Sequence, residues 1–320
     1  MRRGIVLLGG LLCVLATPLG VMGQVYLDPD VTTGSFMADG EQIGFHRAAG
    51  ILPDTADYDW WYGCSPTSAG MMMGYYDRNG YDGVSYDNLV PGGVAESSSY
   101  GGGGLGLLCN QIIASAGHIA DFWVGYGQSG NDPLGGARTI PDDFDSLADF
   151  MGTSQDSCGN LDGGTTFYFY GSGAEFHDYN AVTHGIQDLD GMYGIGEYVD
   201  FATYDTVNLY TQLIPHAFGD YYGNTDGATL DDFKAEIDAG RPVLIHIEGH
   251  TMCGYGYNDA DPNTLYVYDT WYPGTHTLTW GGSYGGLPQW GVTCVELVPE
   301  PTSLGLLAIG LLAVLRRRAA

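Results

Sequence analysis

Both ends of the chain carry a short apolar segment next to arginines, and this pattern confines folding to the residues between them. At the N-terminus, Arg2 and Arg3 precede an apolar stretch over residues 5–16, and small residues near Gly23 suit cleavage. The arrangement predicts a secretory signal peptide over residues 1–23. The folded part is expected over 24–298, roughly 275 residues, enough for one large domain or two small ones with a hydrophobic core.

The C-terminal segment begins with Pro299-Glu300-Pro301, continues as an apolar run over 303–315 and ends in Arg316-Arg317-Arg318. A permanent transmembrane anchor with cytoplasmic arginines is one interpretation. Thirteen helical residues, however, reach only about 20 Å, short of the ~30 Å hydrocarbon core, which favours a transient span. The three parts in this order resemble the PEP-CTERM sorting tail of Gram-negative bacteria. That resemblance implies a sorting tail over 299–320, an exosortase-type partner that cuts near Pro-Glu-Pro, and membrane contact through the tail before processing. It places the sorted protein in the cell envelope, at the cell surface or in the extracellular matrix.

The segment between the two signals is strongly acidic. Of 38 acidic residues only Glu300 lies outside it, and five of the ten basic residues belong to the signals, which leaves 37 acids against five bases and a net charge of −32. Such a surface repels nucleic acid and anionic lipid, so neither is an expected partner. Abundant glycine and tyrosine with alternating aromatic runs favour a folded, strand-rich protein over disorder.

Five cysteines remain after Cys13 leaves with the signal peptide. They are Cys64, Cys109, Cys158, Cys253 and Cys294. An oxidising compartment favours pairing, and an odd number leaves at least one thiol free or bonded to another chain.

Cys64 stands directly before a predicted helix. Pro66 suits a first helical turn, and apolar residues recur at helical spacing up to Tyr76, which predicts a buried helix over 66–76. Gly63 permits a sharp turn into it. A cysteine there points its sulfur at the positive end of the helix dipole, which lowers the thiol pKa and favours the reactive thiolate. The alternative is a structural cysteine at a helix start.

A second group of elements begins at Thr229 and includes His250, which some 185 residues separate from Cys64. A capping-box pattern at Thr229 predicts a helix to about residue 239, followed by a buried strand over 242–247. His250 begins a second predicted strand, and Asp269 follows a third one over 265–268. A histidine at the start of one strand and a carboxylate at the end of the next can meet side by side, which would orient the imidazole as a general base.

The Cys64, His250 and Asp269 order over Tyr62–Tyr76 and Leu230–Trp271 resembles the papain-like cysteine peptidases, and especially the bacteriocin-processing, double-glycine-leader branch. The resemblance implies an α+β fold in which an N-terminal helix carries the cysteine nucleophile and an antiparallel sheet carries the histidine base and the aspartate that orients it. Residues 51–63 lack the glutamine with which family members stabilise the oxyanion. The Cys64 amide and the indole of Trp60 or Trp61 are the replacement candidates, and one lost donor can cost about 10²–10³ in rate.

A large insertion is expected over about 84–228. Its patterns predict helices over 110–123 and 141–151, and strands over 165–170 and 193–199. Cys109 and Cys158 are candidates for one disulfide, which would leave Cys253 to pair with Cys294. Cys253 is also a rival nucleophile because it lies close to His250, but it falls in the middle of a strand.

The sequence supports a metal site less strongly than it supports the cysteine–histidine pair. The spacing of the remaining histidines is too loose for zinc. Two Asp- and Gly-rich turns offer oxygen ligands for calcium but do not match a full EF-hand loop, and such turns usually serve only as turns. The calcium candidates are Asp77, Asn79, Asp82, Asp188 and Asp190.

These observations predict a secreted, envelope-sorted cysteine peptidase that acts on peptide or protein substrates by acyl transfer, without a cofactor unless calcium binds. Two alternatives remain open. One is a catalytically inactive surface or matrix protein on the same fold, and the other is a transamidase that uses the same acyl-enzyme.

Overall fold

The computed structural model describes residues 25–28, 49–135, 145–260 and 263–298; the predicted signal peptide and sorting tail lie outside these residues. The helices are α1 (Cys64–Asn79), α2 (Leu108–Ile113), α3 (Ala116–Phe122), α4 (Leu147–Phe150), α5 (Asp178–His184), α6 (Gly191–Phe201) and α7 (Leu230–Asp238). The strands are β1 (Val25–Asp28), β2 (Ala49–Ile51), β3 (Phe167–Tyr170), β4 (Phe176–His177), β5 (Thr206–Leu213), β6 (Val243–Ile247), β7 (His250–Asn258), β8 (Thr264–Tyr268), β9 (His276–Thr279), β10 (Ser283–Tyr284) and β11 (Leu287–Leu297).

The predicted helix after Gly63 is confirmed as α1, which is longer than expected and includes Cys64 as its first residue. Most of its length is buried, and the usual polar face is missing because small and apolar residues occupy most of its positions. The helix stops at Gly80, which adopts a positive φ of 69° and donates its N–H to the Tyr76 carbonyl. Glycine favours this termination because it has no Cβ to clash.

Within the described residues, nine strands form an antiparallel sheet that packs against α1. The main path runs β4-β5-β11-β6-β7-β8-β9, with β10 paired to β11 and β2 paired to β7. The predicted helix α7 and strands β6, β7 and β8 are confirmed. β6 and β7 form a tight hairpin in which Ile247 pairs with His250, so His250 stands at the very start of its strand. The mixed α+β architecture agrees with the sequence prediction.

The insertion differs from the prediction in two places. Residues 193–199 lie in helix α6 and not in a strand, because Met192, Ile195 and Tyr198 recur at helical spacing and Asp190 caps the helix by accepting the Met192 N–H at 3.2 Å. The predicted helix over 110–123 is divided into α2 and α3 by an extended residue at Ala114, after which Ser115 caps α3. Strand β3 is confirmed, whereas residues 141–144 of the other predicted helix lie outside the described residues and its remainder forms α4.

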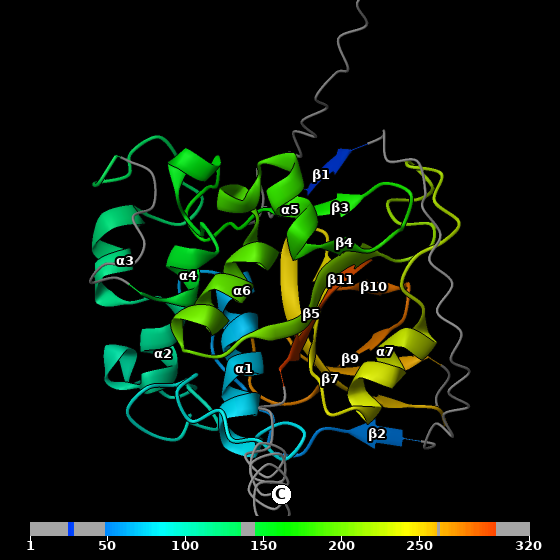
Figure 1. Ribbon diagram of the computed structural model, residues 1–320, viewed down its shortest axis with the longest axis horizontal. Helices are drawn as coiled ribbons and strands as arrows, with labels where there is room; N and C mark the ends of the chain where they lie inside the picture. The colour runs from blue at the N-terminus through cyan, green and yellow to red at the C-terminus, as the bar shows by residue number, and fades with distance from the viewer. Residues whose placement is uncertain (1–24, 29–48, 136–144, 261–262, 299–320) are drawn as a thin grey trace, which may run out of the picture.

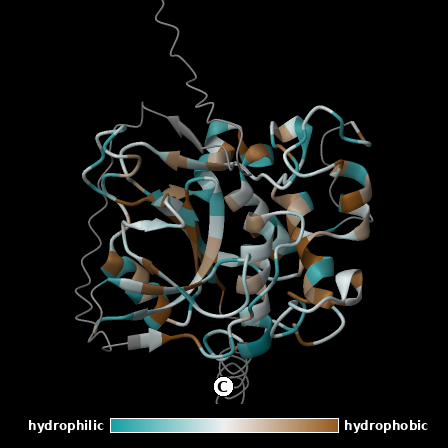
Figure 2. Cartoon of the chain, turned by 180° about the vertical axis from the view of Figure 1, so that it is seen from behind, coloured by the Kyte–Doolittle hydropathy of each residue, from teal (hydrophilic) through white to brown (hydrophobic). Residues whose placement is uncertain are grey.

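In Figure 1, α1 runs through the middle of the molecule, with α2, α3 and α4 on one side and most of the sheet on the other. Helices at the edge carry both hydrophobic and hydrophilic residues (Figure 2), the pattern of helices that cover a core. No helix within the described ranges is long and apolar enough to cross a membrane.

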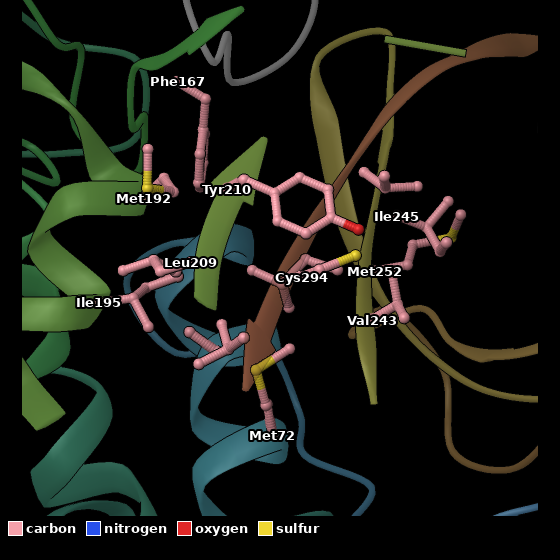
Figure 3. Packing of buried hydrophobic residues seen from close by; sticks show 14 of the residues in the cluster. Met72, Phe167, Met192, Ile195, Leu209, Tyr210, Val243, Ile245, Met252 and Cys294 are labelled. Carbon is pink, nitrogen blue, oxygen red and sulfur yellow. The ribbon is translucent and has the colours of Figure 1, made fainter. Parts of the chain in front are cut away.

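The main core lies between α1, α6 and the central strands. Met72, Met192, Leu209 and Ile245 are all fully buried in it, and Figure 3 shows them converging from four different elements. Because this core contacts both α1 and the sheet, it fixes how the cysteine-bearing helix sits against the histidine-bearing strand.

All five described cysteines are free, so neither predicted disulfide forms. Cys253 on β7 and Cys294 on β11 are separated by the intervening strand β6, which puts their backbones about 9–10 Å apart. Their side chains also point to opposite faces, since Cys294 pairs with Val243, which pairs in turn with Gly254 and not with Cys253. The separation of the two backbones exceeds the ~7 Å limit on the Cα–Cα distance of a disulfide.

Candidate active site

Polar contacts attach the start of α1 to the start of β7. Ser65 Oγ and Thr251 Oγ1 share a hydrogen bond of 2.9 Å, and Ser68 Oγ donates to the Thr251 carbonyl at 3.0 Å. Thr251 Oγ1 also lies 3.2 Å from Nδ1 of the buried His246. Ser65 and Thr251 immediately follow Cys64 and His250, so their contact brings the thiol and the imidazole close together.

His250 is held in one orientation by a main-chain acceptor. Its Nε2 lies 2.7 Å from the carbonyl oxygen of Asp269. Because a carbonyl only accepts, Nε2 carries the proton, and Nδ1 is left as the nitrogen available for the side-chain hydrogen bond with Cys64. His250 is 6% exposed and Cys64 4% exposed, so both groups are largely removed from water.

The structure therefore changes the part expected of Asp269. Its position beside His250 is as predicted, but the contact uses the main chain and not the carboxylate. Oδ1 accepts the N–H groups of Trp271 and Tyr272 at 2.8 and 2.9 Å, and Oδ2 accepts the hydroxyl of Tyr284 at 2.5 Å. The carboxylate thus stabilises the loop that supplies the carbonyl.

This arrangement predicts a difference between two substitutions of the same residue. Asp269→Asn keeps an acceptor for the loop amides and the carbonyl for His250, so the alkylation rate of Cys64 should fall less than about fivefold. Asp269→Ala leaves buried donors unsatisfied, at a cost of about 1–3 kcal/mol each, and should lower both the rate and the unfolding temperature. Equal loss of alkylation in Asp269→Asn and His250→Ala would show that the carboxylate acts on the histidine directly.

Trp271 covers the imidazole of His250 from one side. The two rings stack with centroids 4.0 Å apart and an interplanar angle of 23°. The chain reaches this position through Thr270, which adopts a positive φ of 65° although it is β-branched. Such strain costs on the order of 1–3 kcal/mol and persists where surrounding contacts enforce it. Here the Thr270 carbonyl accepts the Trp60 N–H at 2.9 Å, which ties this turn to the segment before Cys64.

The electrostatics of the site favour a thiolate. Burial raises the pKa of the Cys64 thiol, but the charge of His250, a hydrogen bond from its side chain, the Thr251 amide and the Ser65 hydroxyl all lower it, and the net pKa is below the ordinary value. The start of α1 adds the positive end of its dipole. Cys64 and His250 are thus an interacting thiol–imidazole pair.

Comparison with known families agrees with this geometry. Residues 51–281 match the model of the Peptidase_C39 like family, which covers more than half of the chain. The chain belongs to the Peptidase_C39 like family. Residues 297–319 match the PEP-CTERM protein-sorting motif, so the C-terminal tail is an exosortase sorting signal and the protein is of the kind sorted to the cell surface. No curated protein and no solved structure matches the chain.

Membership of the Peptidase_C39 like family implies a papain-like core. The three candidate oxyanion donors, which are the Trp60 and Trp61 indoles and the Cys64 amide, differ in their surroundings. The Trp61 indole N–H donates to the Ala114 carbonyl at 3.0 Å, so it is committed to the fold. The half-buried Trp60 ring packs edge-on against Trp123 and Tyr126, with centroids 5.9 Å away in each case. The amide of Cys64 precedes the first helical hydrogen bond of α1, from Thr67 N–H to the Gly63 carbonyl at 3.1 Å, so it lies outside the helical hydrogen-bond series and belongs to the same residue as the sulfur.

Cys253 does not share the environment of Cys64 in this Peptidase_C39-like domain. It is fully buried in the middle of β7, and burial, together with the charge of Asp57, raises its pKa to about 12. It stays a neutral thiol at ordinary pH and is a poor rival nucleophile.

Cys64 opens onto a narrow pocket between α1 and the sheet. The pocket is also lined by His250, Phe167, His246 and Trp290. His246 remains neutral, because burial lowers its pKa to about 3, and its two ring nitrogens bond Thr251 and Thr293 hydroxyls. The pocket beside the thiol is therefore uncharged apart from the Cys64–His250 pair.

The calcium candidates have structural roles or stand apart. Asp77 accepts the amides of Ala95 and Val90 at 2.8 and 3.3 Å, and Asn79 Nδ2 donates to the Tyr75 carbonyl. Asp82 is exposed in a turn, whereas Asp188 lies in a short 3₁₀ helix (Gln187–Leu189) ahead of the helix cap Asp190. The described residues contain no group of three or more His, Cys, Asp or Glu side chains able to hold a metal ion.

Asp190 instead predicts a pH effect on stability. Burial raises its pKa to about 7, despite hydrogen bonds from the amides of Met192, Tyr168 and Tyr193, from an ordinary value of 3.8. The folded state therefore binds more protons between these values, so the free energy of unfolding should fall as pH rises, by up to about 1.4 kcal/mol per unit, and level off above about pH 7.

Urea unfolding from pH 4.5 to 8 would measure this effect. Asp190→Asn removes the titration, so its stability should decline less steeply than that of the wild type over this range. Parallel profiles for the two proteins would contradict the assignment.

Several residues of the site carry no recognisable signal in the sequence. Ser65, Thr251 and Tyr284 are ordinary polar residues whose roles follow only from the packing of α1 on the sheet. Trp271 had one indirect signal, its place two residues after Asp269.

Proposed function

We propose that this protein is an exported cysteine peptidase in which Cys64 is the nucleophile and His250 the base. The observation that carries the proposal is the Cys64 thiol at the N-terminus of α1, with its pKa lowered by His250. The family match and the orientation of the imidazole by the Asp269 carbonyl support it.

The reaction would proceed by acyl transfer. The Cys64 thiolate attacks the carbonyl carbon of a peptide, and the oxyanion accepts a hydrogen bond from the Cys64 amide. His250 Nδ1 gives its proton to the leaving amine, and a thioester forms. The imidazole then takes a proton from water, which attacks the thioester and releases the acid and the free thiolate.

The wider organisation belongs to the same proposal. Residues 1–23 would direct export, 24–298 would form the peptidase domain with an insertion over about 84–228, and 299–320 would be removed or exchanged by an exosortase. The site would then operate in the envelope or on the cell surface.

A non-catalytic surface protein is the second candidate. The observation that favours it is the commitment of the Trp61 indole to Ala114, which leaves the oxyanion with the Cys64 amide as its evident donor. A transamidase would share every step up to the thioester and differ only in the acceptor that resolves it.

Trapping the acyl-enzyme tests the proposal. Purified protein incubated with a peptide mixture should release new termini and show a mass adduct on Cys64 after an acid quench. Cys64→Ala should abolish both, whereas the matched control Cys253→Ala should retain both.

Products joined to an added primary amine would identify a transamidase. Neither adduct nor cleavage in the wild type, together with an ordinary Cys64 thiol, would leave the non-catalytic protein.

A further inference from the structure

The candidate site and the point at which the sorting tail leaves the fold lie at opposite ends of the same elements. Cys64 begins α1, and Trp290 on β11 lines the pocket beside it. At the other end of α1, the Tyr76 hydroxyl donates to the Val295 carbonyl at 2.8 Å. Just beyond, the Tyr86 hydroxyl donates to the Val298 carbonyl, also at 2.8 Å. The last described residue is therefore fixed at the C-terminal end of α1 (Figure 1).

Two independent lengths give the same separation. From Cys64 to Asn79, α1 rises about 23 Å at 1.5 Å per residue. From Trp290 to Val298, eight strand residues extend about 26 Å. Both elements are buried parts of the core, so this separation is a rigid property of the domain.

The connection from the domain to the apolar segment is short. The first leucine of the apolar run over 303–315 is Leu304, six residues after Val298, so the connection to it spans at most about 20 Å. Pro299 and Pro301 further restrict it, because proline fixes φ. The Pro-Glu-Pro residues themselves lie within about 10 Å of Val298, too near their own end of the domain to reach Cys64.

We propose that the end of the domain around Val298 and Tyr86 faces the lipid bilayer that holds the tail, and that Cys64 points away from it. The site then receives substrates from the far side, in trans, and does not process the Pro-Glu-Pro of its own chain. Exchange of the tail for another attachment keeps this orientation, since the new C-terminus stays at the same end. The proposal rests on the sorting motif and the fold, and it holds whether or not the proposed peptidase activity exists.

Short-range quenching in liposomes tests the orientation. The full chain carrying Cys13→Ala and Cys64→Ala is reconstituted in phosphatidylcholine vesicles whose head groups bear a nitroxide quencher. One fluorophore is attached at Ser85→Cys, beside Tyr86, or at Glu248→Cys, beside His250; both native residues are exposed. The four remaining cysteines are buried and give a low background.

Quenching of the fluorophore at position 85 should exceed that at position 248 at least threefold. Insertion of a 20-residue Gly-Ser linker after Val298 should reduce this difference, because it frees the domain to turn. Equal quenching at both positions with the native tether, stronger quenching at 248, or failure of the full chain to float with the vesicles would overturn the proposal. None of these outcomes depends on catalysis, so they are distinct from failure of the acyl-enzyme test.

Discussion

Alkylation of Cys64 by iodoacetamide should reach half its maximal rate below the pH of an ordinary thiol, and His250→Ala should move that midpoint upward by at least about one pH unit. Burial on its own raises the pKa of Cys64, and His250 is the largest influence that lowers it. Removing the imidazole leaves burial dominant, and each unit corresponds to about 1.4 kcal/mol of lost thiolate stabilisation.

Peptide mapping of the alkylated protein makes the measurement specific to Cys64. Cys253 is an internal control in the same sample, because burial raises its pKa to about 12 and it should remain unlabelled near neutral pH. A Cys64 profile with an ordinary midpoint that ignores His250→Ala would refute the thiol–imidazole pair, and with it the proposed peptidase.

Gly194→Ala should cost about 3 kcal/mol or more of folding stability. A Cβ at this position would lie 2.1 Å from the Phe150 carbonyl oxygen and 2.7 Å from the Met151 Cα. These are main-chain atoms at the end of α4, which cannot move aside as a flexible side chain can, so α6 and α4 must separate.

Gly196→Ala is the matched control on the same helix. Its Cβ would meet only the Leu209 Cδ2 atom, at 2.7 Å, and the end of a leucine side chain can rotate away. The gain in helix propensity, up to about 1 kcal/mol, offsets the crowding, so this variant should stay near wild-type stability. Urea midpoints measured by circular dichroism distinguish the two, and equal losses would contradict the close approach of α6 to α4.

Sequence patterns predict the elements of the insertion less well than those around Cys64 and His250. The aromatic residues of 193–199 predict a strand, yet this segment lies in α6 because its apolar residues recur at helical spacing. Local composition and periodicity disagreed there, and burial against α4 follows the periodicity. The predicted cystine pairs failed for a different reason, since sequence separation carries no information on which strand lies between two cysteines.

Local signals determined the elements that carry the chemistry. Gly63 before Cys64, the capping box at Thr229 and the buried run after Pro242 each act within a few residues of chain, so the helix and strands they predict are those observed. The order of Pro-Glu-Pro, apolar run and arginines likewise predicts the sorting tail. By contrast, the hydrogen bond from His250 reaches the Asp269 main chain and not its carboxylate, and the Trp61 indole is committed to Ala114. Both hydrogen bonds join residues that are far apart in the sequence. The packing of α1 against the sheet sets the distances between such residues, so only the tertiary structure decides which atoms form these bonds.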